Sequence, residues 1–244
     1  RNEMARVCRG DRAMERLLPV FDRVGVDTRY FVRPLEWYTE GQPFETRNAV
    51  YATSALELAE EAARACLDRS GTSPDTIDHI YFVTTTGLMT PSLDARLASR
   101  LGLRPDVRRL PLFGLGCAAG AGALVRAADT LRAYPTHRAL VISVELCSLV
   151  FSPVARTATD LVGAALFGDG AAAVVVSGDE TGGEGPAIRA TRTHLFKEAP
   201  DLMGWNFTAD GMRLVLSHDV PKFVATGVAP VVNKFLDAQG LSLP

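Results

Sequence analysis

This sequence lacks an excess of positive charge, long apolar runs and a leader-like N-terminus. Its 244 residues include 26 basic and 28 acidic side chains, a formal net charge of −2, so nucleic acid is not an expected partner. No apolar run reaches the roughly 18 residues that a membrane span requires, because Arg126 and Asp129 interrupt residues 118–131. Residues 1–12 are rich in charge and have no apolar core, so we expect no secretory signal and a cytoplasmic protein.

Cysteine is scarce as well. The four cysteines, Cys8, Cys66, Cys117 and Cys147, form no CxxC pair and lie in apolar surroundings in the sequence. Disulfide frameworks and zinc sites both depend on characteristic cysteine spacings. We therefore expect neither a disulfide framework nor a metal site.

The composition, with 47% hydrophobic and 22% charged residues, is that of an ordinary globular protein of one large or two small domains. Hydrophobic periodicity predicts strands alternating with helices, hence an α/β layered fold. Helices are expected over 12–24, 49–69, 92–101, 117–134, 159–165 and 221–239, and a loop over 36–48. Strands are expected over 28–32, 77–84, 107–113, 139–146, 171–177, 188–196 and 212–216. The glycine-rich stretch 178–185 predicts a boundary between a unit 1–178 and a unit 179–244.

The stretch around Cys117 carries the clearest chemical signal. An apolar run ends at Phe113, Gly114 and Gly116 allow a tight turn, and small residues then begin a predicted helix. Cys117 would lie at that helix N-terminus, where free N–H groups and the helix dipole favour a thiolate. The small neighbours also leave room for an acyl group. The alternative is a small apolar residue packed in a Gly/Ala-rich helix, and these residues alone leave both interpretations open.

Two further patterns concern the ends of predicted strands. Residues 84–87, Thr-Thr-Thr-Gly, follow a continuous apolar strand and place polar groups at its C-terminal end, where open α/β sheets form their sites. Residues 66–74 resemble 235–244, but only the first copy leads into a buried strand. Either this weak repeat is chance, or the chain ends just before a core strand of a second half.

Four motifs together resemble the type III polyketide synthases, the chalcone-synthase-like branch of the thiolase superfamily, and in particular its bacterial members. They are Thr84–Gly87, Gly114–Gly120, Ser143–Leu149 and Leu166–Ala173. The resemblance extends from about Arg12 to the C-terminus and implies a thiolase-like layered αβαβα fold, expected to be incomplete at both ends. Compared with the family, a first core strand before Arg1 and a strand after Pro244 are missing.

The resemblance implies an acyltransferase. Cys117 would take an acyl starter from a CoA thioester, extend it by decarboxylative condensation with malonyl-CoA, and cyclise it to a pyrone, resorcinol or related polyphenol. CoA thioesters would be the substrates, with no separate cofactor. A homodimer is implied too, with the loop 84–94 near the partner, and the apolar Leu88, Met89 and Pro91 agree with an interface there.

Further site residues follow only from the resemblance. Phe167 matches an aromatic gate between the CoA tunnel and the cavity, although it could be a core aromatic. Leu214 matches a second gate position, and Thr85, Thr90 and Cys147 match cavity-lining positions, with Thr90 at the dimer interface. Because Leu214 and Thr90 are smaller than the plant residues, an aliphatic, even long, starter is expected. Arg16 and Arg23 match CoA-phosphate ligands, although surface arginines are usually only solvated.

The sequence also departs from the family pattern. None of its histidines, His79, His137, His194 and His218, lies in a His-Pro-Gly-Gly context, and no matching Asn is present. Each histidine is interpreted as a surface or core residue, and the chain is not expected to be a complete catalyst. Two alternatives stay open: an initiating ketoacyl-carrier-protein synthase, and a catalytically inactive thiolase-fold binding or structural protein.

Overall fold

The computed structural model of the chain describes residues 10–150, 157–183 and 185–243, and a four-stranded mixed sheet lies at its centre. The strand order is β2-β1-β3-β4. The first three strands are parallel and β4 is antiparallel to β3. The strands are β1 (His79–Val83), β2 (Arg108–Leu112), β3 (Arg138–Leu146) and β4 (Asp169–Ser177). The parallel strands therefore all end at one edge of the sheet.

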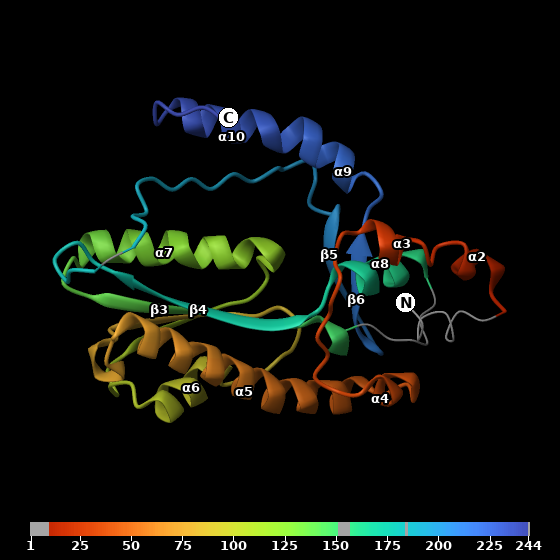
Figure 1. The fold of residues 1–244 in the computed structure, drawn as a ribbon, viewed down its shortest axis with the longest axis horizontal. Coiled ribbons are helices and arrows are strands. Elements are labelled where there is room, and N and C mark those ends of the chain that lie inside the picture. Colours follow the sequence, from red (N-terminus) through yellow and green to blue (C-terminus); the bar gives the residue numbers. More distant parts are fainter. Residues whose placement is uncertain (1–9, 151–156, 184, 244) are drawn as a thin grey trace.

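Helices cover both faces of this sheet (Figure 1). The long helix α5 (Phe44–Ser70) and α6 (Leu93–Leu101) pack on one face, and α7 (Ala119–Ala133) packs on the other. Side chains alternate along β1, so Ile80 and Phe82 join the core under α5, whereas Tyr81 and Val83 join the core under α7. This arrangement is an α/β/α unit of the predicted thiolase-like fold.

Small residues allow the helices to lie close to the sheet. In α5, Ala55, Ala59 and Ala63 are fully buried, and in α7, Ala119, Ala123 and Ala127 are fully buried. Their spacing of four residues places each set on one helix face. Helix α5 ends at Gly71 and α6 at Gly102, both with the positive φ of a left-handed C-cap, as the sequence predicts for α5.

The remaining elements lie beside the strand ends and above α7 (Figure 1). A hairpin of β5 and β6 stands next to the end of the sheet, close to α8. The C-terminal helix α9 continues through a π-helical turn into α10. Their bounds are β5 (Met203–Thr208), β6 (Gly211–Leu216), α8 (Ala158–Leu166), α9 (Val220–Phe223), the turn η4 (Val224–Val228) and α10 (Ala229–Asp237).

Several sequence predictions were wrong near the N-terminus. Residues 12–24 form two short helices, α2 (Arg12–Glu15) and α3 (Val20–Arg23), because Pro19 between them has no N–H with which to continue one helix. The predicted loop 36–48 instead contains α4 (Leu35–Thr39) and the first turn of α5.

Two predicted strands are absent from the described residues. Residues 28–32 form no strand, because they cross the start of β4 instead of running along it. At the crossing, Asp169 N donates a hydrogen bond to Tyr30 O at 3.0 Å. Residues 188–196 pair with no strand, and Leu195 there is 78% exposed. The sequence also missed β5, which pairs with the predicted strand β6. None of the helices in the described part of the chain has the length and apolar character needed to cross a membrane.

Candidate functional site

Cys117 lies between the end of β2 and the start of α7. Gly114 and Gly116 turn the chain with φ of +89° and +53°, conformations that favour glycine. The short 3₁₀ turn η2 (Gly116–Ala118) then carries Cys117 and leads directly into α7. The Cys117 side chain is exposed. The predicted position at a helix N-terminus is therefore confirmed, and the thiol is open to a ligand rather than packed in the helix.

A half-buried carboxylate, that of Glu145, joins two strand ends at the same edge of the sheet. Val83 of β1 pairs with Ser143 of β3, and continuing this register by two residues places Thr85 opposite Glu145. The Glu145 carboxylate accepts hydrogen bonds from the backbone N–H of Thr85 at 3.0 Å, from its hydroxyl at 3.0 Å and from the Thr86 hydroxyl at 2.7 Å. Burial raises the pKa of Glu145, and these hydrogen bonds only partly oppose the shift. Glu145 thus fixes Thr85, a predicted cavity residue, in place.

Cys147 begins the 3₁₀ turn η3 (Cys147–Leu149) after β3. Burial, together with the charges of Glu145, Asp169 and Cys117, raises the pKa of Cys147 to about 12. Cys147 is therefore a neutral thiol at physiological pH, and it interacts electrostatically with Cys117. Of the two, only Cys117 is exposed.

A second half-buried carboxylate, that of Asp169, lies at the start of β4. Asp169 accepts hydrogen bonds from Ser148 N at 2.8 Å, from Ser148 Oγ at 2.6 Å and from Val32 N at 2.9 Å. The hydroxyls of Ser148 and Tyr38 are 2.7 Å apart. Burial raises the pKa of Asp169 despite these donors. The network joins the segment after Cys147 to the N-terminal segment of the chain.

Phe167 ends α8 and is half-buried. Arg29 holds this helix end, because its Nε donates to Ala165 O at 2.7 Å and its Nη2 donates to the same oxygen. Its Nη1 donates to Val26 O at 3.1 Å. The turn that carries the predicted gate residue is therefore fastened to the segment after α3.

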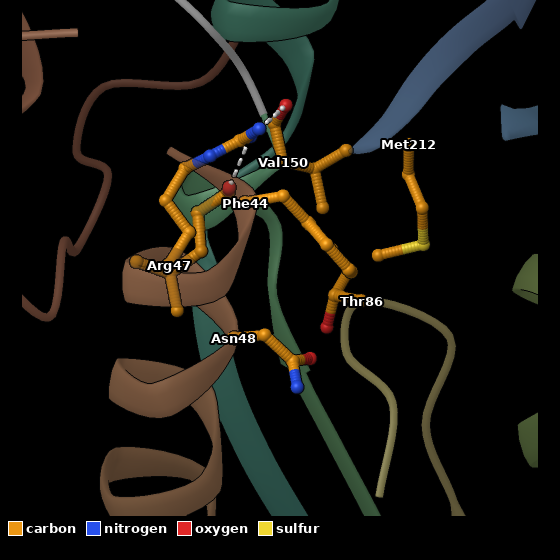
Figure 2. Close-up of a pocket in the computed structure, with 7 residues that line it drawn as sticks. Phe44, Arg47, Asn48, Thr86, Val150 and Met212 are labelled. Atoms are coloured by element: carbon orange, nitrogen blue, oxygen red, sulfur yellow. Dashed lines mark hydrogen bonds between the residues drawn. The ribbon is translucent and has the colours of Figure 1, made fainter. Parts of the chain in front are cut away.

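The other predicted site residues occupy three different places. Leu214 is half-buried on β6, on the same strand face as Met212, which lines a small cavity with Thr86 (Figure 2). Thr90 is exposed in the loop after β1. Arg16 and Arg23 are exposed at the ends of α2 and α3. The strand-end site thus brings together Cys117, Cys147 and Thr85, and the roles of all the predicted site residues stay predictions.

The histidines lie elsewhere. His79 begins β1, at the opposite end from Thr85, and its Nε2 is 2.9 Å from Nδ1 of His137. Burial and the neighbouring His137 lower the pKa of His79. His194 and His218 are exposed, and His194 is not on a strand, contrary to prediction. Among the hydrogen bonds of the described residues, none joins a histidine to Cys117.

Glu145 and Asp169 lie in two of the sequence motifs, but the sequence predicts no role for either. Their signal was position: Glu145 is an acidic residue near the end of an otherwise apolar strand, and Asp169 stands between two glycines. Three cysteines, Cys66, Cys117 and Cys147, are free, in agreement with the prediction, and Cys8 lies outside the described residues.

Comparisons with family models and with known proteins indicate the same family. The family described as "Chalcone and stilbene synthases, N-terminal domain" matches residues 33–180. A putative chalcone synthase of Bacillus subtilis (strain 168) is 39% identical over 240 residues, which cover 94% of this chain and 66% of that protein. The 1,3,6,8-tetrahydroxynaphthalene synthase of Streptomyces peucetius subsp. caesius is 43% identical over 234 residues, 95% of this chain and 61% of that protein.

A solved structure agrees with these sequence matches. The 1,3,6,8-tetrahydroxynaphthalene synthase of Streptomyces coelicolor A3(2), a bacterial type III polyketide synthase, superposes with a TM-score of 0.93 at 33% identity. The match covers 98% of this chain and 68% of that structure. The chain therefore spans less than two thirds of the length of the two curated relatives, at 66% and 61%, and has the fold of the corresponding part.

Proposed function

Since the chain belongs to the chalcone and stilbene synthase family, whose bacterial members are type III polyketide synthases, we propose that it forms the acyl-loading part of such a synthase. Cys117 is the nucleophile in this proposal. The observation that carries it is the exposed Cys117 thiol at the start of α7, at the sheet edge where Glu145 holds Thr85.

The first step is a transthioesterification. The Cys117 thiolate attacks the carbonyl carbon of an acyl-CoA, the bond from that carbon to the CoA sulfur breaks, and CoA leaves as a thiolate that takes a proton from solvent. Free N–H groups at the start of α7 stabilise negative charge at this position. The half-buried Cys147, whose pKa is raised to about 12, does not compete as a nucleophile.

The second step extends the chain. Malonyl-CoA loses CO₂, the resulting enolate carbon attacks the acyl group on Cys117, and the Cys117 thiolate leaves as the new carbon–carbon bond forms. Positioned donors must stabilise the enolate oxygen. We assign this role to none of the four histidines of the chain, since His79 and His137 pair with each other and the other two are exposed.

The product class is a polyphenol or pyrone, and the starter is an aliphatic acyl group. Relatives with tetrahydroxynaphthalene synthase and phloroglucinol synthase names support a polyphenol. Leu214 and Thr90, which are smaller than the plant residues, support an aliphatic starter. CoA enters as part of the substrates, bound by Arg16 and Arg23, and the synthase needs no further cofactor. It acts in the cytoplasm, where acyl-CoA thioesters are made.

The functional unit is a homodimer, with the loop 84–94 near the partner. Large apolar side chains are exposed near β2 and in that loop: Leu88, Leu110, Phe113 and Leu115 are 39%, 43%, 48% and 52% exposed. Light scattering at micromolar concentration should give twice the protomer mass. A mass equal to that of one protomer at that concentration would show that the proposed homodimer is wrong.

Mass spectrometry of the protein expressed from its complete gene tests the catalytic role. Incubation with a short acyl-CoA should add one acyl group to the peptide that carries Cys117, and Cys117→Ser should abolish condensation with malonyl-CoA. Cys147→Ser is the control and should still be acylated. An acyl group on Cys147 or Cys66 would overturn the assignment, and an unacylated Cys117 would favour a catalytically inactive member of the family.

A further inference from the structure

Arg47 is a buried cation whose hydrogen bonds, among the described residues, all go to backbone carbonyls, and its guanidinium also lies 6.0 Å from the centre of the Phe44 ring. Its side chain rises from the first turn of α5 and the residue is 7% exposed. Nη1 donates to Leu149 O at 2.9 Å and to Val150 O at 3.2 Å, and Nη2 donates to Asp210 O. Figure 2 shows the guanidinium reaching the carbonyls of the 149–150 segment. One side chain therefore joins segments that are about 60 residues apart in the sequence.

Within the described parts of the chain, no carboxylate pairs with this guanidinium. The Asp210 carboxylate pairs with Arg213 at 2.9 Å, although its charge still raises the pKa of Arg47 against the larger, lowering effect of burial. The Nε atom of Arg47 is buried and has no hydrogen-bond partner there. Carbonyl oxygens have fixed directions, so these contacts set the positions of both segments more strictly than a mobile ion pair would.

Both segments lead to predicted walls of the acyl cavity. Leu149 ends the turn η3, which begins at Cys147, and Val150 is its C-cap. Asp210 lies in the turn of the β5–β6 hairpin, and β6 then carries Met212 and Leu214 on one face. Met212 is 4% exposed and lines the same small cavity as Arg47 and Thr86 (Figure 2). Arg47 thus connects the Cys147 side of the site to the strand of the second gate position.

Gly211 shows how closely the hairpin turn is pressed against α5. A Cβ atom at Gly211 would lie 2.6 Å from the Phe44 ring and 3.1 Å from Nη2 of Arg47. The residue also has a φ of +105°, which side chains rarely adopt. The turn therefore has no freedom to move toward the helix, and the Arg47 hydrogen bond to Asp210 O keeps it from moving away.

The cavity beside Arg47 is too small for a ligand. Its volume is about 10 Å³, which is room for about one water molecule. Asn48, which also lines it, already exchanges two hydrogen bonds with the Leu88 backbone, at 2.9 Å and 2.8 Å. The unpaired Nε of Arg47 therefore belongs to a structural contact and not to a binding site.

We propose that Arg47 is a positioning residue that sets starter specificity. It does so by fixing the distance between residues 147–150 and strand β6, which carries Leu214. The proposal rests on the proposed function, in which these two residues line the acyl cavity. Loss of the three carbonyl contacts lets the hairpin move outward, so the cavity accepts longer acyl chains and discriminates less between lengths.

The test compares Arg47→Lys with Arg64→Lys in the complete protein. Lysine keeps the charge, but its ammonium cannot span two segments as the guanidinium fork does. Arg64 lies on the same helix, is 51% exposed, and also donates to a backbone carbonyl, that of Arg100, at 2.6 Å. The readout is the kcat/KM for a decanoyl-CoA starter divided by that for a butyryl-CoA starter, together with the melting temperature.

Arg47→Lys should raise this ratio about tenfold, the effect of an altered apolar pocket, while Arg64→Lys should leave it unchanged. Because Arg47→Ala removes the whole side chain, added guanidinium ion should return its ratio toward the wild-type value. An unchanged ratio in Arg47→Lys, or a loss of activity equal for all starters that guanidinium does not restore, would overturn the proposal. A wild-type protein that fails to acylate Cys117 would instead reject the proposed function.

Discussion

The Thr86 hydroxyl donates a hydrogen bond to the Glu145 carboxylate at 2.7 Å and accepts one from the backbone N–H of Leu146 at 2.8 Å. One hydroxyl therefore joins the end of β1 to the end of β3, just before Cys147. Glu145 is half-buried and its pKa is raised, so ionisation of its carboxylate destabilises the folded protein at this edge of the sheet. The strength of the hydrogen bonds that Glu145 makes with Thr85 and Thr86 therefore depends on whether its carboxylate is protonated.

Glu145→Gln should be tolerated, whereas Glu145→Ala should not. The glutamine oxygen can accept from Thr85 N and Thr86 Oγ, as Glu145 Oε2 does, and its NH₂ group can donate to the Thr85 hydroxyl in place of Oε1. Alanine leaves the buried N–H of Thr85 without a partner and should cost about 1–3 kcal/mol. Urea denaturation of both variants measures the difference.

The pH dependence gives a sharper test. A carboxyl group whose folded pKa is raised contributes stability below its unfolded pKa of about 4.5, and this contribution is lost as pH rises through the folded value. Glu145→Gln lacks this titration, so its stability relative to wild type should increase from pH 5 to pH 8. A difference that is constant over this range would show that the pKa of Glu145 is not raised.

Gly87→Ala should strongly destabilise the protein. A Cβ atom at this position would lie 2.1 Å from Cγ of Tyr51, which is 1% exposed and donates a hydrogen bond to Thr84 at 3.0 Å. Tyr51 has no space into which to move, so the cost should be about 3 kcal/mol, the upper end for overpacked sites. Thermal unfolding measures it.

Gly120→Ala is the matched control. Gly120 is the second residue of α7, and apart from the helix's own backbone no heavy atom lies within 4 Å of its added Cβ, so alanine should be tolerated or stabilise the helix by at most about 0.5 kcal/mol. If both variants melt together with wild type, the contact between Gly87 and Tyr51 is looser than the structure has it.

The centre of the sheet could be predicted because β1 and β3 are buried on both faces. Continuous apolar runs at 77–84 and 139–146 correspond to β1 and β3, which lie at the centre of the sheet. Residues 28–32 and 188–196 have strand-like composition but no neighbouring strand to pair with. Pairing is a long-range property, so local sequence did not distinguish these segments from β6.

The nucleophile could be predicted because its position depends on a local backbone pattern. Two glycines and a helix start indicate Cys117 locally. Arg47 gave no such signal, because its three partners are backbone carbonyls, which any sequence can supply. The hydrogen bond from Arg29 to Ala165 O could not be predicted for the same reason.

Arg16→Ala and Arg23→Ala should each raise the KM for acyl-CoA with little change in kcat. Both side chains are exposed, and in the proposed function each makes a charge-assisted contact with a CoA phosphate. Loss of one such contact should raise KM about tenfold at low salt, and less at high salt. The same starter as an N-acetylcysteamine thioester, which has no phosphates, should show no effect, and Arg12→Ala is the matched control. Equal effects on both thioesters would remove the two arginines from the CoA site.

Cys147→Phe and Thr90→Trp should shorten the accepted starter. Cys147 is a half-buried thiol beside Cys117, so a phenyl ring there removes volume from the predicted acyl cavity. In the proposed dimer, Thr90 lies at the partner interface and lines the cavity. Each variant should reduce kcat/KM for a decanoyl starter at least about tenfold while butyryl turnover stays close to wild type, because a blocked apolar pocket discriminates by chain length. Thr53→Trp, at another exposed threonine, on α5, is the control and should leave the profile unchanged. If both starters lose activity equally in Cys147→Phe and Thr90→Trp, these residues do not line an acyl tunnel.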